Sequence, residues 1–423
     1  MEKLLESYFD RLWPICRSIT GNGLRESFKI LQELIPLELT EIKTGTQVFD
    51  WQIPKEWNIE DAYIITPNGE KICDLKINNL HIVNYSIPQN REITFDELKK
   101  HLHYREDMPD AIPYVTSYYK ENWGFCLSFE QFKKLPQEGK YKIVIDSSLK
   151  DGELTYGQLL LPGKTNKEII FSSYLCHPSM ANNELSGPLV LAFLYQQIKN
   201  LPDRKYSYRF ILAPETIGVI AFLAKYGMQL KENIEAGYVL TCVGDDAPFV
   251  FKRSKKDNTL ADRAAEHVLK NSGHPYKSIP FAIGGSDERQ YCSPGFNMPV
   301  ASITRSMYQQ YKEYHTSLDN KHFISFSAMK KTVELYLNIV QTLELNEKYV
   351  NKIAYCEPQL GKRGLYTATG GTWDSGIEYT RLLLHFLAFA DGEHDLIDVA
   401  EKRNVPALQF KSIIEACKEK NLI

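Results

Sequence analysis

The sequence predicts an α/β protein with a mixed, mainly parallel sheet flanked by helices, an inserted mostly β domain and a C-terminal winged-helix-like domain. Three observations predict this class. Apolar runs of strand length alternate with helical patterns from about residue 156 to 347, as in parallel sheets covered on both faces. Short aromatic and β-branched runs with turn signals fill about 48–148. Three short helical stretches in 376–423 have the spacing of a winged helix or helix-turn-helix.

These patterns also set the expected domain boundaries. Residues 1–47 and 151–350 are expected to form one discontinuous α/β domain. Residues 48–150 are the inserted β domain, and 351–423 are the winged-helix-like domain. The inserted domain is a candidate for a lid over the site or for the contact of a homodimer.

The individual elements follow from hydrophobic periodicity and from helix start signals. Leu24–Ile35 has apolar residues at helical spacing, and Ser186–Ile198 is a helix that is apolar on nearly every side, which indicates burial. Ser327, Asp395 and Pro406 mark helix starts. The other expected strands are 168–176, 208–213, 238–243 and 299–304, and the other expected helices are 260–269, 327–343, 378–389, 396–403 and 407–420.

Composition and charge exclude several classes of function. The net charge is −3, and the helix at 407–420 mixes glutamates with its lysines, so it lacks the basic face that phosphate neutralisation requires. We therefore expect no nucleic-acid partner. Charges within 1–19 interrupt any signal-peptide core, and no apolar run reaches membrane-spanning length, so no membrane partner is expected. Eight scattered cysteines without a CxxC pair predict reduced thiols in a cytoplasmic protein.

Four polar clusters follow the expected strands, at 176–187, 213–218, 284–291 and 314–319. In open α/β sheets, sites lie beyond the carboxyl ends of the strands, which makes these clusters candidates for one site. Each has a simpler explanation when it is taken alone. The first histidine could be structural, the glutamate a helix cap or an internal ion pair, the third cluster a solvated loop, and the last aspartate a helix cap.

The order of the clusters is much more specific. It resembles the co-catalytic zinc aminopeptidases, which show a His after a strand, a bridging Asp in an Asn-Asp-Asp-x-Ser-Gly type segment, then Glu-Glu-x-Gly and a late Tyr-His-Thr-x-x-Asp. More closely, the chain looks like a subfamily of aminopeptidase-like proteins often associated with polysaccharide biosynthesis. The motifs of that subfamily stand here as His-Pro-Ser, Pro-Glu-Thr-Ile-Gly, Gly-Gly-Ser-Asp-Glu-Arg-Gln-Tyr and Tyr-His-Thr-Ser-Leu-Asp. That subfamily also has an inserted β domain and a winged helix, so the resemblance covers nearly the whole chain.

The resemblance implies that His177 and His315 are metal ligands and that Glu215 is the general base. Asn183 stands where the bridging Asp is expected, and is a neutral candidate ligand. Thr216 and Thr241 replace two further carboxylates, and Asp245 and Asp246 lie just beyond Thr241.

These departures affect the number of metal ions. Two zinc ions repel one another, and anionic ligands offset that repulsion, so the loss of three carboxylates disfavours a two-metal site. One zinc ion, held by His177, His315 and either Glu215 or water, satisfies a four-coordinate site with one open position. The two histidines bind different metals in the parent pattern, so this single site requires some rearrangement.

The resemblance implies a zinc-dependent hydrolase of a small peptide or other amide-containing substrate. Asp287 or Glu288 would anchor a substrate amine, Tyr314 would contact substrate, and Asp319 would orient the His315 imidazole. Two other classes stay open. One is a non-catalytic protein that binds a peptide or glycan precursor on the same scaffold, and the other is a regulator that uses the winged helix.

Overall fold

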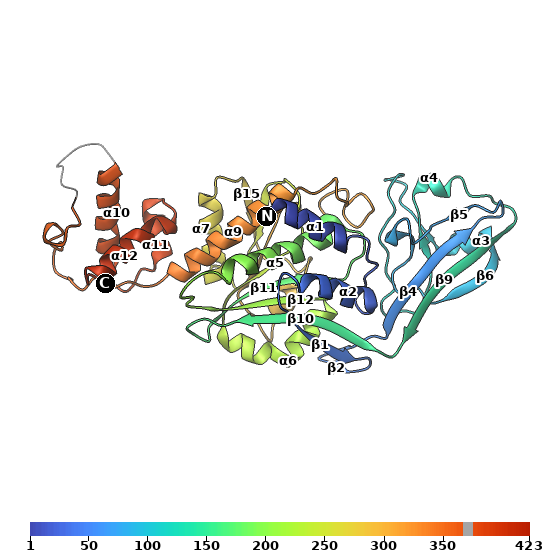
Figure 1. Cartoon of the computed structure of the whole chain (residues 1–423), viewed down its shortest axis with the longest axis horizontal. Helices are drawn as coiled ribbons and strands as arrows, with labels where there is room; N and C mark the ends of the chain where they lie inside the picture. The colour runs from blue at the N-terminus through green and yellow to red at the C-terminus, as the bar shows by residue number, and fades with distance from the viewer. Residues whose placement is uncertain (367–374) are drawn as a thin grey trace. The chain divides into compact units, whose positions relative to one another are not determined.

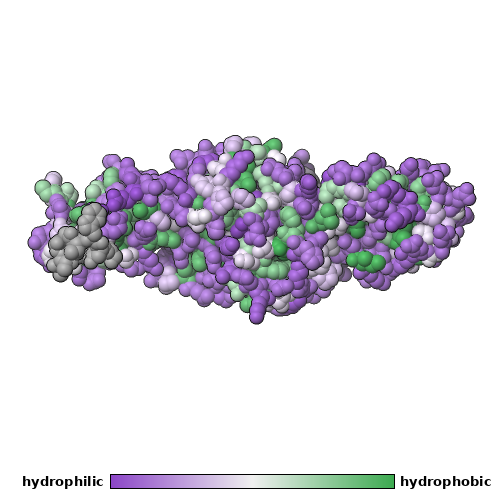
Figure 2. Space-filling view, turned by 90° about the horizontal axis from the view of Figure 1, so that it is seen from above, coloured by the Kyte–Doolittle hydropathy of each residue, from purple (hydrophilic) through white to green (hydrophobic). Residues whose placement is uncertain are grey.

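The structure, a computed structural model, describes residues 1–366 and 375–423, which divide into two compact units (Figure 1). Hydrophobic residues lie scattered among hydrophilic ones on the face shown in Figure 2. Within the described ranges, no helix has the length and apolar character needed to cross a membrane. The first unit comprises Met1–Ala261 and Lys277–Val333, and the second comprises Asp262–Tyr276 and Glu334–Ile423.

An eight-stranded sheet in the order β1-β10-β12-β11-β13-β16-β14-β15 forms the centre of the first unit. The central strands β12, β11, β13 and β16 are parallel, whereas β1, β10 and β14 pair antiparallel with their neighbours. The predicted mixed sheet flanked by helices is thereby confirmed. The strands span Glu38–Lys43 (β1), Glu153–Leu161 (β10), Glu168–Tyr174 (β11), Ser207–Ala213 (β12), Ile234–Val239 (β13), Phe249–Lys252 (β14), Tyr276–Ile279 (β15) and Val300–Thr304 (β16).

Helices cover both faces of this sheet, with α5 (Ser186–Ile198) and α6 (Ile217–Asn233) on opposite sides (Figure 1). Helix α5 has exactly the predicted bounds, and all but two of its side chains are buried or nearly so. Gly187 is required at its start because a Cβ atom there would overlap the Leu240 carbonyl oxygen. The other helices are Glu2–Leu12 (α1), Asn22–Leu31 (α2), Leu260–Asn271 (α7), Glu288–Tyr291 (α8) and Phe326–Leu345 (α9).

The residues expected as an inserted β domain, 48–150, lie within the first unit and have a sheet and an apolar core of their own. Four antiparallel strands in the order β5-β4-β9-β6 pack against that core, which includes Trp123 and Tyr141. The elements are Gln47–Val48 (β2), Trp51–Gln52 (β3), Glu56–Ile65 (β4), Lys71–Ile72 (β5), Gln89–Thr94 (β6), Phe95–Leu98 (α3), Leu102–His103 (β7), Phe125–Cys126 (β8), Phe129–Phe132 (α4) and Lys140–Lys150 (β9).

Two of the differences from the expected boundaries concern residues singled out in the sequence. Strand β13 ends at Val239, so Thr241 lies in the loop that follows it and not inside the strand. Helix α9 begins at Phe326, where the hydroxyl of Ser325 accepts a hydrogen bond from the Ala328 N–H at 3.2 Å. The predicted cap at Ser327 is therefore wrong by two residues, because both serines precede the same apolar run and either could begin it.

The second unit contains α10 (Ser375–Phe389), α11 (Leu396–Arg403) and α12 (Lys411–Glu419) around one apolar core. The expected winged-helix range includes residues 367–374, which lie outside the described residues. Most of α7, expected in the α/β domain, belongs to this unit instead. The reason is ionic, because Arg263 binds the Asp395 carboxylate at 2.6 and 2.7 Å and Asp398 at 2.8 Å.

Asp395 is confirmed as the N-cap of α11, and its ionisation should stabilise the second unit. Burial opposes ionisation, but Arg263, Asn346 and the Asp398 N–H lower the pKa of Asp395 to about 2. A carboxyl with a lowered pKa stabilises the folded state above its unfolded pKa of about 4 and loses that effect as pH falls towards 2. We expect a loss of about 2 kcal/mol over this range. Hydrogen exchange of the α11 amides should report it, and Asp395→Ala should show the loss already at pH 7 and little further change with acid.

Candidate active site

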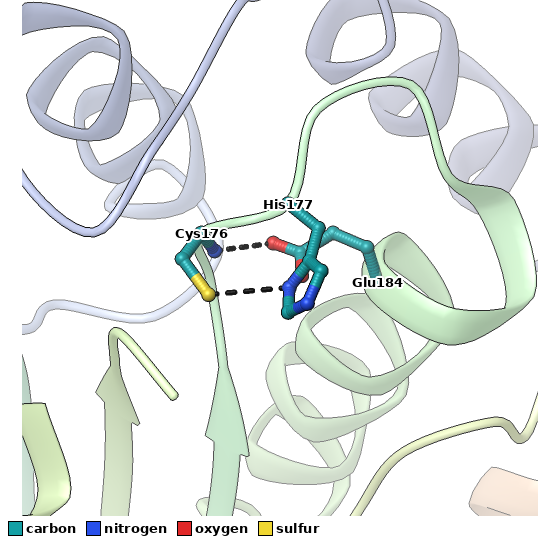
Figure 3. Close-up of side chains that lie close together, drawn as sticks. All are labelled: Cys176, His177 and Glu184. Atoms are coloured by element: carbon teal, nitrogen blue, oxygen red, sulfur yellow. Dashed lines mark hydrogen bonds and ion pairs between the residues drawn. The ribbon is translucent and has the colours of Figure 1, made fainter. Parts of the chain in front are cut away.

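His177 lies in the loop after β11 and is the centre of the candidate site (Figure 3). Its imidazole is almost completely buried. The Nδ1 atom lies 3.0 Å from Glu184 Oε2, and the Nε2 atom lies 3.7 Å from Glu215 Oε2. Burial disfavours the charged imidazole, but the hydrogen bond and charge of Glu184, together with Glu215, outweigh this and raise the pKa of His177. The histidine thus has a carboxylate on each side of its ring.

Glu184 was not a candidate in the sequence, although it fixes the orientation of His177. It lies in a single turn of π-helix at Ala181–Leu185, is fully buried, and also accepts a hydrogen bond from the Cys176 N–H at 2.6 Å. The only sequence signal was its place inside the polar cluster after β11. A carboxylate on one imidazole nitrogen is the usual partner of a metal-binding histidine, and it leaves the other nitrogen free to bind.

Cys176, His177 and Glu184 place three donor atoms within 4.8 Å of one another. The Cys176 Sγ atom lies 3.2 Å from His177 Nδ1 and accepts a hydrogen bond from the Glu215 N–H at 3.4 Å. Burial and the nearby charges of Glu184 and Glu215 raise the pKa of the Cys176 thiol well above its usual range. A protonated thiol is a poor metal ligand. Cys176 and Glu184 therefore contact the Nδ1 side of the His177 ring, and Nε2 is the nitrogen left for a ligand.

Glu215 follows β12 at a strained point of the backbone. Thr216 has a φ of 64° and a ψ of −77°, a conformation that costs a β-branched residue about 1–3 kcal/mol. Two contacts hold it: its N–H donates to Asp287 Oδ1 at 2.8 Å, and its Oγ1 accepts from Arg289 at 2.9 Å. Burial raises the pKa of Glu215, while His177 and Arg289 oppose this effect. With 27% of its side chain exposed, Glu215 is the accessible carboxylate beside His177.

His315 comes into the site from a loop between β16 and α9, with a left-handed φ of 55°. Its ring centre lies 5.5 Å from that of His177, and it stacks on Tyr314 at 3.9 Å. Burial and the neighbouring His177 lower the pKa of His315 to about 3, so the imidazole is neutral and able to bind a metal. Two imidazoles on one tetrahedral zinc, with Zn–N distances of about 2.1 Å, have ring centres roughly 5 Å apart. The observed spacing therefore fits a single ion.

Asn183 and Thr241 are neutral residues at positions where zinc aminopeptidases have carboxylates. The Tyr174 hydroxyl lies 2.6 Å from Thr241 Oγ1, accepts a hydrogen bond from Asn183 Nδ2 at 2.9 Å, and contacts the Asn183 carbonyl. The Asn183 Oδ1 atom is buried and has no protein partner. Asp245, just beyond Thr241, instead accepts a hydrogen bond from Asn182 Nδ2 at 2.8 Å. Among the described residues of this network, the neutral Asn183 Oδ1 atom is the oxygen left for a ligand.

Asp319 has a different position from the one expected. Its two carboxylate oxygens accept hydrogen bonds from the backbone N–H groups of Asn182 and Asn183 at 2.6 and 2.8 Å. Among the described residues, none donates to or accepts from the His315 ring. The expectation that Asp319 orients His315 is therefore corrected, since its carboxylate caps the π-helical turn that carries Glu184. Tyr314 does lie beside the site through its stack on His315.

Asp287 and Glu288 are adjacent in sequence but have different surroundings. Glu288 is buried against Lys252 and accepts a hydrogen bond from the Tyr308 hydroxyl at 3.2 Å, so its charge is already neutralised. Asp287 is also buried, but its Oδ2 atom has no protein partner. Burial and the charge of Glu215 raise the pKa of Asp287 well above its usual range. Both carboxylates keep one oxygen without a protein partner, but Glu288 is already paired with Lys252, so Asp287 is the better candidate for an amine anchor.

Comparisons with known proteins agree with this fold. A Bacillus subtilis zinc aminopeptidase matches with a TM-score of 0.56 at 13% identity, over 81% of this chain and 94% of that one. A Shewanella amazonensis M28 peptidase precursor gives 0.55 at 12%, over 81% of this chain and 92% of that one. At such identities the likeness concerns the fold alone, and it defines an aminopeptidase-like scaffold.

More similar proteins define the family. A Clostridium acetobutylicum protein, named as a polysaccharide biosynthesis protein with an aminopeptidase-like domain, is 45% identical over 407 residues, or 96% of this chain and 93% of the relative. A crystal structure named as a peptidase from the same species matches with a TM-score of 0.93 at 42% identity, over 100% of this chain and 96% of that one. The chain belongs to the family described as a domain of unknown function (DUF4910), which matches residues 7–346, and residues 347–423 match a winged helix-turn-helix.

Proposed function

We propose that this protein hydrolyses an amide bond with the help of one zinc ion. The observation that carries the proposal is the convergence of His177 Nε2, the neutral His315 ring and the Glu215 carboxylate in one partly open site. His177 and His315 would hold the ion, and the unpartnered Asn183 Oδ1 is a weaker, neutral third donor. A zinc ion at this place would supply a bound water of lowered pKa and would polarise the substrate carbonyl.

The chain's own residues would then move the proton and hold the substrate. Glu215 accepts the proton of the attacking water, and it later returns that proton to the leaving amine. Its raised pKa makes it a better proton acceptor than an ordinary carboxylate would be near neutral pH. Glu184 keeps the His177 ring in place while this happens.

Asp287 is the group that we assign to a free amine of the substrate. An ammonium group beside its unpartnered Oδ2 would offset the repulsion from Glu215 and favour the charged carboxylate. Such an anchor fits a small peptide or an amino-sugar amide with a free amine near the cleaved bond. The name of the Clostridium relative favours a substrate from polysaccharide biosynthesis.

Metal analysis of protein purified without chelator tests the proposal, together with a screen of aminoacyl and amino-sugar amides. We expect one zinc per chain in the wild type, much less in His177→Ala and His315→Ala, and turnover that depends on zinc. Absence of zinc and of turnover, with tight binding of the same amides, would favour the non-catalytic binding protein. That alternative is supported by Thr216 and Thr241, which stand where zinc aminopeptidases have carboxylate residues.

Glu184→Ala should weaken zinc binding about 10- to 100-fold, the usual effect of removing the carboxylate partner of a histidine ligand. The ring of His177 loses the hydrogen bond that holds it, and the Cys176 N–H loses its acceptor. Titration with a competing chelator measures the change in affinity. Glu184→Gln is the matched variant, since it keeps the shape and an amide oxygen and should retain part of the affinity. Unchanged affinity in both variants would contradict the role assigned to Glu184.

A further inference from the structure

A segment of the expected inserted domain, 111–118, which we call the strap, lies directly against the loop that carries His315. The Tyr114 N–H donates to the His315 carbonyl at 2.8 Å. The Ser317 N–H donates to the Ile112 carbonyl at 2.8 Å, and the Ile112 N–H donates to Ser317 Oγ at 3.0 Å. These three bonds hold the left-handed backbone of His315 in place. The strap is thus a wall of the candidate site.

The aromatic ring of Tyr114 contacts both histidines. Its centre lies 5.0 Å from that of His177 and 5.2 Å from that of His315, and it meets the His315 ring nearly edge-on at 86°. A residue that touches both expected metal ligands is also within reach of a substrate bound between them. No motif in the sequence pointed to Tyr114, because the strap lies about two hundred positions from His315 along the chain.

The hydroxyls of Tyr114 and Tyr118 lie 2.6 Å apart and either can donate to the other. Two hydroxyls carry two protons, and their mutual hydrogen bond uses only one. No other hydrogen bond to either hydroxyl occurs among the described residues, so one O–H donor stays available. Burial raises the pKa of both tyrosines well above the usual range, which keeps both protons in place at neutral pH. A hydroxyl that accepts one hydrogen bond also becomes a stronger donor.

We propose that the Tyr114–Tyr118 hydroxyl pair donates the hydrogen bond that stabilises the substrate oxygen as it becomes negative during attack on the amide carbonyl. The pair is close to the reacting groups, since Tyr114 contacts both histidine rings and the Glu215 carboxylate is near enough for its charge to help raise the pKa of Tyr118. The hydroxyls form no covalent bond and transfer no proton. This inference rests on the proposed amide hydrolysis, and it assigns a catalytic role to the inserted domain.

Hydroxyl removal with retention of the rings tests the inference. Tyr114→Phe/Tyr118→Phe removes both donors and should lower kcat about 10²- to 10³-fold, the usual effect of losing an oxyanion donor, with little change in KM. The double change is needed because either hydroxyl can serve as the donor. Tyr119→Phe is the matched control, since it removes an exposed hydroxyl from the adjacent position.

Two further measurements distinguish the loss of a hydrogen-bond donor from a loss of zinc. Zinc affinity should be equal in the double variant and the wild type, and a phosphonamidate analogue of the tetrahedral intermediate should bind the variant about 10²- to 10³-fold more weakly. Unchanged kcat in the double variant of an active enzyme would overturn the inference alone, and so would a fall in zinc affinity that accounts for the lost rate. A wild type that binds zinc but neither hydrolyses amides nor binds the analogue would contradict the proposed function itself, and the inference with it.

Discussion

Lys252→Met is expected to lower the free energy of unfolding of the first unit by about 3–5 kcal/mol, the effect of removing one partner from a buried ion pair. Lys252 lies on β14 and is 2% exposed, and its ammonium contacts the Glu288 carboxylate and the Tyr308 hydroxyl. Glu288 is completely buried and its Oε2 atom already lacks a partner. Without Lys252, the carboxyl must either stay charged in an apolar place or take up a proton, and both are unfavourable.

Matched variants separate the charge effect from the lost packing. Lys252→Met combined with Glu288→Leu removes both charges and should recover most of the stability, because a buried ion pair is often replaceable by apolar groups. Lys255→Met changes an exposed lysine three positions away and should have an effect below about 0.5 kcal/mol. Denaturant unfolding followed by hydrogen exchange in β14 gives the values. If Lys252→Met cost less than about 1 kcal/mol, the pair would not be the structural feature that we infer, and Glu288 would again be a candidate for substrate contact.

Much of the α/β fold could be predicted because its signals are local. Helix α5 had its predicted bounds, since its apolar run of helix length between polar ends is a local pattern. Strands β11 and β12 were predicted to within two residues for the same reason. Helix α7 shows where such reasoning ends. Its amphipathic pattern predicted the helix, but contacts with distant residues such as Asp395, Asp398 and Glu401 tie most of it to the second unit.

The candidate site was predictable only for residues that stand in a motif. His177, Glu215 and His315 do come together, as their order along the chain suggested. Glu184 was not predicted because, in the same polar cluster, it is Asn183 that occupies the position of the bridging aspartate. Tyr114 and Tyr174 could not be found at all, since tyrosine is a common core residue and its contact with a histidine depends on tertiary structure.

The expected contact between Asp319 and His315 was wrong for a physical reason. A carboxylate four residues after a histidine can reach the imidazole, but two backbone N–H groups at the start of a turn offer it two charge-assisted hydrogen bonds instead. The loop of His315 and the turn that holds Glu184 are therefore joined by direct hydrogen bonds, and Glu184 in turn contacts His177.

Glu215→Gln is expected to lower kcat about 10²- to 10⁴-fold, because the amide cannot accept the proton of the attacking water. Gln keeps the size of the side chain, so zinc binding and KM should change little if Glu215 acts as a base. A large loss of zinc would instead identify the carboxylate as a ligand. Glu232→Gln, a change of an exposed glutamate on α6, is the control and should leave all three values unchanged.

The pH dependence gives a sharper test of the same residue. The reaction requires the charged form of Glu215, so kcat/KM should rise with pH through the pKa of this carboxyl in the free enzyme. Burial raises that pKa above its ordinary value of 4.5, so the acidic limb should lie at a higher pH than an exposed glutamate would give. In Glu215→Gln this limb should disappear along with most of the rate. An acidic limb that persists unchanged in the variant would assign the titration, and the role of base, to another group of the site.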